Sequence, residues 1–288
     1  MHLETSVESS VSADPTRFVY GGVAFDISTA PSLAWELGKE HRRFLTAYDA
    51  GPAAVAVRVA ASAAAELAAD EGREIHFAWS GSAARVRTRG ARIELRELAS
   101  RSFAASALIS PTSNGCSSLC TALAGALIDR VGGVVLHASG IEVDGGVVIF
   151  VGPSEAGKTT AANHCQGARG FAKDRVAAYP TPLGWHVAPM SGGDEVHLPV
   201  SPHRVLPLRG VLRVCRGEAP GIRTAPLPRA IHLLRESLQM SDRPPEGEVA
   251  LLDRLIEMSG EVPVGTIHTV LGNPVLPSVV EWLEGARS

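Results

Sequence analysis

The sequence predicts an α/β (α+β) fold in which a small, mostly antiparallel β domain precedes a larger domain built around a strand, a glycine-containing loop and a helix. The first observation is a set of three runs, at Glu74–Trp79, Ala83–Arg89 and Arg92–Leu98, that alternate polar and apolar residues between glycine-containing turns. That pattern is typical of an antiparallel meander. The second is VVIFVGPSEAGKTT at Val147–Thr160, which reads as an apolar strand, a tight loop and the start of a helix.

The chain divides into three segments by composition. Residues 1–17 are polar and read as a flexible leader, residues 18–112 as the small α+β N-terminal domain, and residues 113–288 as the loop-containing domain. The second boundary follows from the turn cluster SPTSNG at Ser110–Gly115, because clusters of such residues mark connections between elements.

Three further segments are expected in the small domain. Phe18–Ile27 predicts a hairpin around Gly21-Gly22, and Leu33–Leu45 has helical spacing. Ala53–Ala61 alternates like a strand, although its alanines would also suit a helix. We find no nucleophile–base pairing and no metal-ligand spacing in this domain.

Composition excludes several classes of protein. Apolar content of 45% and charged content of 20% over 288 residues are ordinary for a globular protein, and a net charge of −3 argues against a broad nucleic-acid-binding surface. The N-terminus lacks an apolar signal core, and the longest apolar stretch, Ala53–Ala69, is interrupted by Arg58 and Glu66. The four cysteines form no C-x-x-C pair. We therefore expect a cytoplasmic protein with no membrane and no nucleic-acid partner.

The larger domain is expected to surround a hairpin. A helix from near Ser117 to Gly132-Gly133 leads into two apolar runs joined by Asp144-Gly145, a strong hairpin signal. The strand entering the loop is therefore one arm of a hairpin. Further strands are expected at Gly170–Tyr179, Thr181–Pro189, Leu208–Gly217 (central) and Thr266–Gly272, and further helices at Thr160–Gln166, Pro226–Met240, Gly247–Met258 and Pro277–Leu283.

The loop matches G-x-x-x-x-G-K-[ST], the P-loop or Walker A motif, at Gly152, Gly157, Lys158 and Thr159. Backbone N–H groups of such a loop surround phosphate oxygens, the lysine reaches the β- and γ-phosphates, and the threonine hydroxyl ligates Mg²⁺. The alternative, a simple glycine-containing turn, explains less because motif and context agree. We expect a nucleoside triphosphate, bound by Gly152, Pro153, Ser154, Glu155, Ala156, Gly157, Lys158, Thr159 and Thr160, with the Glu155 carboxylate pointing outward.

From about Ser117 to Gly217 the chain resembles the HPr kinase/phosphorylase family and its smaller HPr-kinase-like serine kinases. The run LHASGIEVDGGVVIFVGPSEAGKTT at Leu136–Thr160 matches the family's histidine, hairpin and P-loop, with His137 at the histidine position. FAKDRVAAY at Phe171–Tyr179 looks like the family's acidic "DDR" strand. The resemblance implies a fold like the C-terminal part of phosphoenolpyruvate carboxykinase, with ATP held between P-loop and sheet.

Two departures favour the small kinases over a regulator acting on HPr. Lys173 replaces the first of two acidic residues, and the second glycine-rich signature of the bifunctional enzymes is not recognisable. The expected catalytic residues are Asp174, His137 and Lys158, with Thr159 and Asp174 holding Mg²⁺. Asp174 could instead accept the proton of a serine hydroxyl, and spacing does not separate these roles.

The remaining candidates keep alternative interpretations. His137 could orient a carboxylate, touch the γ-phosphate or simply end a strand, and Arg175 could neutralise the transferring phosphoryl or form a surface ion pair. Ser191–Asp194 lies where a substrate-binding loop would help.

The leading hypothesis is an ATP-dependent kinase for a serine of a protein or peptide, with Mg²⁺. The alternatives are a catalytically degenerate ATP-binding scaffold or sensor, favoured by Lys173, and a carboxykinase-type small-molecule enzyme, for which no matching arginine and metal constellation is found. Family relatives form oligomers, so a homo-oligomer is a further expectation from the resemblance.

Overall fold

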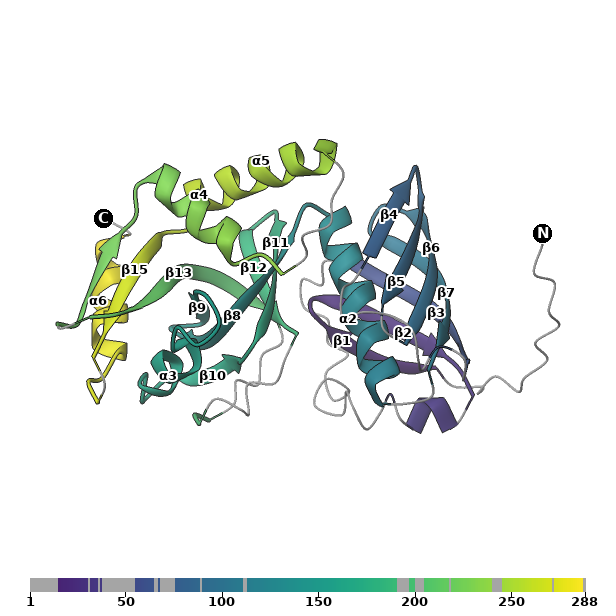
Figure 1. Ribbon diagram of the computed structural model, residues 1–288, viewed down its shortest axis with the longest axis horizontal. Coiled ribbons are helices and arrows are strands. Elements are labelled where there is room, and N and C mark those ends of the chain that lie inside the picture. Colours follow the sequence, from purple (N-terminus) through teal and green to yellow (C-terminus); the bar gives the residue numbers. More distant parts are fainter. Residues whose placement is uncertain are drawn as a thin grey trace. The chain divides into compact units, whose positions relative to one another are not determined.

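The computed structural model describes residues 15–30, 32–35, 37, 55–64, 67, 76–88, 90–110, 113–190, 197–199, 205–217, 219–239, 245–270 and 272–286. They form two compact units that divide within helix α2 (Ser113–Arg130), between residues 123 and 124 (Figure 1). Each unit combines helices with a mixed sheet, which confirms the α+β class. Most of the predicted leader and most of the predicted helix at Leu33–Leu45 fall outside the described residues, although Thr16 and Arg17, predicted to be in the leader, belong to strand β1 (Thr16–Tyr20). The domain boundary at 112/113 stays a prediction.

The first unit is built on a seven-stranded sheet of order β1-β2-β3-β7-β6-β5-β4. Its strands are β1 Thr16–Tyr20, β2 Val23–Ser28, β3 Val55–Ala63, β4 His76–Ser80, β5 Ala83–Thr88, β6 Ala91–Ala99 and β7 Ser102–Ile109. β4 to β6 form the antiparallel meander that the alternation predicted, and β7, which was not predicted, extends it. β3 lies parallel to β7. The strand expected near Ala53–Ala61 is therefore confirmed as β3.

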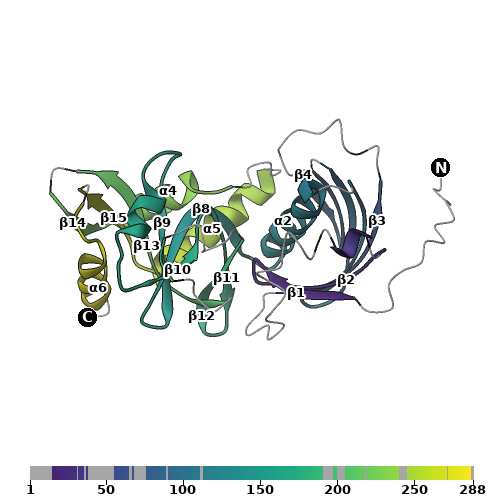
Figure 2. The same ribbon diagram turned by 90° about the horizontal axis from the view of Figure 1, so that it is seen from below.

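The strands of this sheet curve around α2 (Figure 2). From Gly115 to Ile128 every residue of α2 except Ser117 and Ser118 is buried, so this part of the helix is enclosed on all sides rather than amphipathic. The helix begins at Ser113 rather than at Ser117, so it includes part of the turn cluster. Gly115 is buried against the Ser110 carbonyl, where a Cβ would not fit, and this packing overrides its weak helix propensity.

The second unit is built on an eight-stranded sheet of order β10-β8-β11-β12-β13-β15-β14, with β9 paired to both β8 and β13. Its strands are β8 Val134–Val143, β9 Gly146–Val151, β10 Arg169–Ala172, β11 Arg175–Thr181, β12 Gly184–Pro189, β13 Leu206–Arg216, β14 Gly221–Thr224 and β15 Val264–Thr269. Its remaining helices are α3 Lys158–Asn163, α4 Leu227–Glu236, α5 Pro245–Glu261 and α6 Leu276–Gly285. α3 ends earlier than the predicted Gln166.

The predicted hairpin is present, with β8 antiparallel to β9 and Val143 opposite Gly146. Asp144 and Gly145 have φ angles of 49° and 68°, so both turn residues lie in the left-handed region that a type I′ turn requires. On its other edge β9 is parallel to β13. The P-loop strand is therefore both a hairpin arm and a member of a parallel pair.

All six residues of β9 are buried, because helices cover both faces of the sheet (Figure 1). Val147, Ile149 and Val151 pack into a core closed by α4 and α5. Val148 and Phe150 pack into a second core closed by α3 and α6. This explains why β9 reads as a continuous apolar run rather than as an alternating one.

A β-bulge at Arg209 sets the phase of the central strand β13. Leu208 pairs with Val147 and Gly210 with Val148, so Arg209 is the extra residue. Because of it, Leu208 and Val211 face the same core, and Leu212 faces the other. Without the bulge, the remainder of β13 would present its side chains to the wrong faces.

β13 and α6 approach each other closely at Gly210. A Cβ at this position would lie 2.6 Å from the Trp282 ring. We predict that Gly210→Ala lowers the free energy of unfolding by ~1–3 kcal/mol, the usual range for overpacking. Urea unfolding followed by circular dichroism measures it, and a double-mutant cycle with Trp282→Leu should show that the cost shrinks when the ring is absent.

Gly260, near the end of α5, is the matched control, since nothing lies within 4 Å of a Cβ there. Gly260→Ala should leave stability unchanged or raise it by up to ~1 kcal/mol, through better helix propensity. An unchanged urea midpoint for Gly210→Ala would contradict the close approach.

Candidate functional site

The P-loop leaves the carboxyl end of β9 and returns into the first turn of α3. Gly152 and Gly157 have φ angles of 145° and 92°, in the region that favours glycine. Gly152 also lies against Ala156, whose Cβ would be 3.1 Å from an added Cβ. The two glycines of the motif are therefore required by the path of the backbone.

Glu155 has a φ angle of 64°, which a residue with a side chain rarely adopts. Its side chain is exposed, which agrees with the outward orientation expected from the sequence. Pro153, Ser154 and Thr160 are exposed as well, while Ala156 and Thr159 are half-buried. The loop thus carries a strained residue with a negative charge at its tip.

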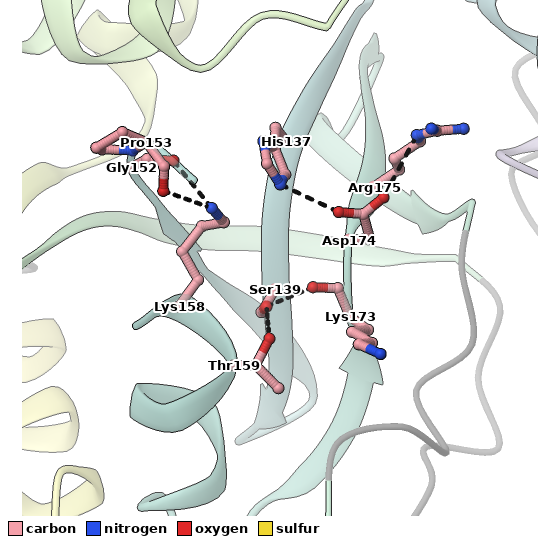
Figure 3. Close-up of polar contacts among 9 residues, drawn as sticks. All are labelled: His137, Ser139, Gly152, Pro153, Lys158, Thr159, Lys173, Asp174 and Arg175. Atoms are coloured by element: carbon pink, nitrogen blue, oxygen red, sulfur yellow. Dashed lines mark hydrogen bonds and ion pairs between the residues drawn. The ribbon is translucent and has the colours of Figure 1, made fainter. Parts of the chain in front are cut away.

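Lys158 folds back over its own loop. Its Nζ donates to the carbonyl oxygens of Gly152 at 3.0 Å and Pro153 at 2.9 Å (Figure 3). Only 7% of the residue is exposed. Burial lowers the pKa of the Lys158 ammonium, while the nearby Asp174 carboxylate acts in the opposite direction.

His137 and Ser139 alternate with Ala138 on β8, so their side chains share the face that looks toward α3. In Figure 3 they lie between the loop and the Lys173–Asp174 segment. Ser139, which is fully buried, was not identified from the sequence. The signal that could have found it is the two-residue spacing from His137 on a predicted strand.

The Ser139 hydroxyl connects the loop helix to the Lys173 backbone. Its Oγ donates to the carbonyl oxygen of Lys173, and it lies 3.3 Å from Oγ1 of Thr159. A serine hydroxyl has one proton, so the contact with Thr159 must use the Thr159 proton. The lone pairs of Oγ1 of Thr159 are thereby left to face an incoming cation.

Lys173 and Asp174 lie in a bend between β10 and β11, which both pair with β8. The single strand predicted for Gly170–Tyr179 is therefore wrong. A bulge at Phe171 shifts the register, and the Lys173 carbonyl bonds to a side chain instead of to the ladder. The Asp174 carbonyl accepts from the Ala138 N–H at 3.1 Å, which holds the bend against β8.

The Asp174 carboxylate lies between two basic side chains (Figure 3). Oδ1 is 3.1 Å from Nε2 of His137, and Oδ2 is 3.6 Å from Nε of Arg175. Burial is the largest effect on the pKa of His137 and lowers it; the Lys158 charge lowers it further, against the raising effect of Asp174. The His137 ring is thus biased toward its neutral form, with Nε2 donating to Asp174.

The structure brings together Lys158, Thr159, His137 and Asp174, the four residues expected to carry the chemistry (Figure 3). Arg175 joins them through its ion pair with Asp174. The proposed loop at Ser191–Asp194 lies outside the described residues.

A Mg²⁺ ion fits the donor chemistry of the site. Thr159 offers a hydroxyl oxygen and Asp174 a carboxylate whose side chain is 47% exposed. Mg²⁺ prefers oxygen ligands and is usually held by one or two carboxylates together with phosphate oxygens and waters. Among the described residues, no three His, Cys, Asp or Glu side chains gather to hold a metal by themselves.

Comparisons with known proteins give a distant structural similarity. No protein-family model matches the chain, and no curated protein matches it. Among solved structures it is similar to the Hpr(Ser) kinase/phosphatase from Coxiella burnetii, with a TM-score of 0.31 and 12% sequence identity over 53% of this chain and 89% of that chain. This similarity does not establish a shared fold, so membership of the HPr-kinase-like family stays a prediction.

Two further findings concern the described residues. No helix among them is long and apolar enough to cross a membrane. The four cysteines carry free thiols, and burial raises the pKa of Cys165 to about 12. None of these thiols takes part in the site.

We predict that Ser139→Ala destabilises the protein by ~1–3 kcal/mol, because it removes the hydroxyl donor from the part-buried Lys173 carbonyl. Thermal unfolding followed by circular dichroism measures the loss. Ser139→Cys is the matched control, since it nearly keeps the volume and retains a weak donor, and it should lose less. A wild-type melting temperature for Ser139→Ala would show that the hydroxyl does not hold the bend.

Proposed function

We propose that this chain is an ATP-dependent kinase that transfers the γ-phosphoryl group to a serine hydroxyl of a protein or peptide, with Mg²⁺. The observation that carries the proposal is the grouping of a P-loop lysine, an oriented threonine hydroxyl and a histidine-paired carboxylate around β8 (Figure 3). Phosphoryl transfer needs a clamp on the phosphates, charge neutralisation and an aligned acceptor, and these groups supply each need.

The loop side of the site would bind the phosphates. Backbone N–H groups between Gly152 and Thr160 would donate to the phosphate oxygens, and the Lys158 ammonium would neutralise the β- and γ-oxygens. Thr159 and Asp174 would hold Mg²⁺, which when bound offsets the charge that develops on the leaving group.

The β8 side would prepare the acceptor. The serine oxygen forms a bond to the γ-phosphorus while the bond to the β–γ bridging oxygen breaks, and ADP leaves. In its alternative role, in which it does not hold Mg²⁺, Asp174 accepts the serine proton, directly or through water. His137 fixes the orientation of that carboxylate by donating from Nε2. A neutral His137 suits this role, because it adds no further positive charge beside Asp174, which already pairs with Arg175.

A second candidate is an ATP-binding scaffold or sensor without turnover. The observation in its favour is Lys173, which stands beside Asp174 where the resemblance would have a second acid. This candidate predicts normal ATP binding, no phosphoryl transfer and partner binding that changes with nucleotide.

The decisive test is label transfer from γ-labelled ATP to serine-containing peptides, with and without Mg²⁺. We predict Mg²⁺-dependent transfer that EDTA abolishes and that Lys158→Ala lowers at least ~100-fold, as loss of a preorganised charged group does elsewhere. Arg85→Ala, an exposed change in the first unit, is the control. ATP bound with no transfer to any serine peptide supports the scaffold, and no ATP binding refutes both candidates.

A second prediction concerns the carboxylate at the loop tip. Glu155→Gln should raise ATP affinity about two- to fivefold at low ionic strength, because it removes a screened repulsion of ~1 kcal/mol or less. Glu155→Gly should give the same gain and also raise the melting temperature, since it relieves a left-handed strain of ~1 kcal/mol. Titration calorimetry and thermal unfolding separate the two effects. Equal ATP affinity of wild type and Glu155→Gln would contradict the electrostatic part.

A further inference from the structure

Two arginines and a threonine form a row across the sheet, which starts beside the end of the P-loop strand and runs toward β14. Val151, the last residue of β9, pairs with Arg213 of β13, and Arg213 pairs with Thr266 of β15. Thr266 in turn pairs with Arg223 of β14. Paired residues present their side chains to the same face of a sheet, so these three side chains form one row.

The row lies on the face that α4 covers. Leu212, Val214 and Ile267, the sequence neighbours of Arg213 and Thr266, pack in the opposite core with α6. On β14, Thr224 accepts from the Trp282 indole of α6, which places Arg223 on the other face. The row therefore borders α4 and lies level with Val151, the carboxyl end of β9, while β13 and β15 each continue three residues further.

One flank of α4 completes a polar surface. Glu236 forms a hydrogen-bonded ion pair with Arg213 and lies 3.4 Å from Nε2 of His232. Arg229 is exposed and acts electrostatically on Glu236. We call the combined surface the polar shelf; its residues are Arg213, Arg223, Thr266, Arg229, His232 and Glu236.

The polar shelf leads toward the proposed site. Just past the end of α4, the Ser237 carbonyl accepts from the His137 N–H at 2.7 Å. α4 thus runs from the β14 edge, where Ala225 bonds to Val264, to the strand that holds His137 and Ser139. Ligands of such sheets bind outside the carboxyl ends of the parallel strands, and the row is level with that end at β9. The side chains of His137 and Ser139 face α3, so a peptide that reaches both them and the polar shelf passes around the carboxyl end of β9.

The charge of the polar shelf is opposite to that of the chain. It carries three arginines against one glutamate, whereas the whole chain has a net charge of −3. His232 and Glu236 have 53% and 44% of their side chains exposed, and Arg223 and Arg229 are exposed as well. A local positive surface on a negative protein attracts anionic groups, and arginine pairs well with carboxylates.

We propose that the polar shelf binds an acidic segment of the phosphoryl acceptor, next to its serine. This inference rests on the proposed function. The acceptor serine is placed by Asp174, which is paired with His137 of β8. Strands lie about 4.8 Å apart, so Arg223, four strands from β8, is roughly 19 Å from that strand. An extended peptide advances about 3.3 Å per residue, which places the preferred acidic residue about six positions from the serine. Guanidinium groups do not offer the apolar slot that a nucleotide base requires.

The test uses fluorescein-labelled peptides with one serine and glutamates about six residues before or after it. Controls have the same peptides with glutamine or lysine. Fluorescence anisotropy with the full chain, without nucleotide, should show at least tenfold tighter binding of one glutamate peptide than of its glutamine counterpart. That affinity should fall with added salt and fall at least tenfold in Arg223→Glu. The lysine peptide should recover part of the lost affinity with that variant.

Arg235→Glu is the matched control variant. Arg235 is also exposed on α4, but its ion pair, 3.5 Å long, is with Glu248 of α5 and not with a residue of the polar shelf. It should bind the glutamate peptide as wild type does. Thermal unfolding checks that both variants fold.

Equal binding of glutamate and glutamine peptides, or wild-type binding by Arg223→Glu, would overturn the inference. Weaker ATP binding by Arg223→Glu with unchanged peptide binding would also overturn it, because the polar shelf would then belong to the nucleotide. The proposed kinase activity is measured separately. If no label is transferred but Arg223→Glu loses binding of the acidic peptide, the kinase proposal is refuted and the peptide-binding role of the polar shelf is supported. If label is transferred equally to the glutamate and glutamine peptides, the kinase proposal is supported and the role of the polar shelf is refuted.

Discussion

Enclosure of β9 on all sides is the constraint on which the rest of the second unit depends. Both edges of this strand are hydrogen-bonded, to β8 and β13, and both faces are covered by helices. Such a strand cannot shift its register without moving two cores. The P-loop follows its last residue directly, so the most enclosed element of the unit positions the site.

β8 performs the second organising role, because one strand supports both sides of the site. Its edges pair with β9, β10 and β11, while His137 and Ser139 project from it toward the loop. The Ser139 hydroxyl then joins the helix of the loop to the Lys173–Asp174 bend. A change on either side of the site, at the loop or at the Lys173–Asp174 bend, is therefore transmitted to the other side through β8.

Local patterns predicted the parts of this structure that depend on local chemistry. The hairpin required only the Asp144-Gly145 pair, and the P-loop required its two glycines and Lys158. Features that depend on partners far along the chain were not predictable. The bulge at Arg209 follows from matching β13 to two cores. The break at Lys173 follows from a serine on another strand, and the start of α2 from packing that overrides propensity.

The environment of Lys158 has a consequence for how tightly the loop can hold its ligand. A flexible lysine gives up rotamer freedom worth up to ~2 kcal/mol when it engages a phosphate. Here the side chain is already buried and bonded to two loop carbonyls, so that entropy is lost during folding. A phosphate has only to replace two carbonyl acceptors with stronger anionic ones. The loop therefore gives up some conformational stability in the free protein, and in return less side-chain entropy is lost when the phosphate binds.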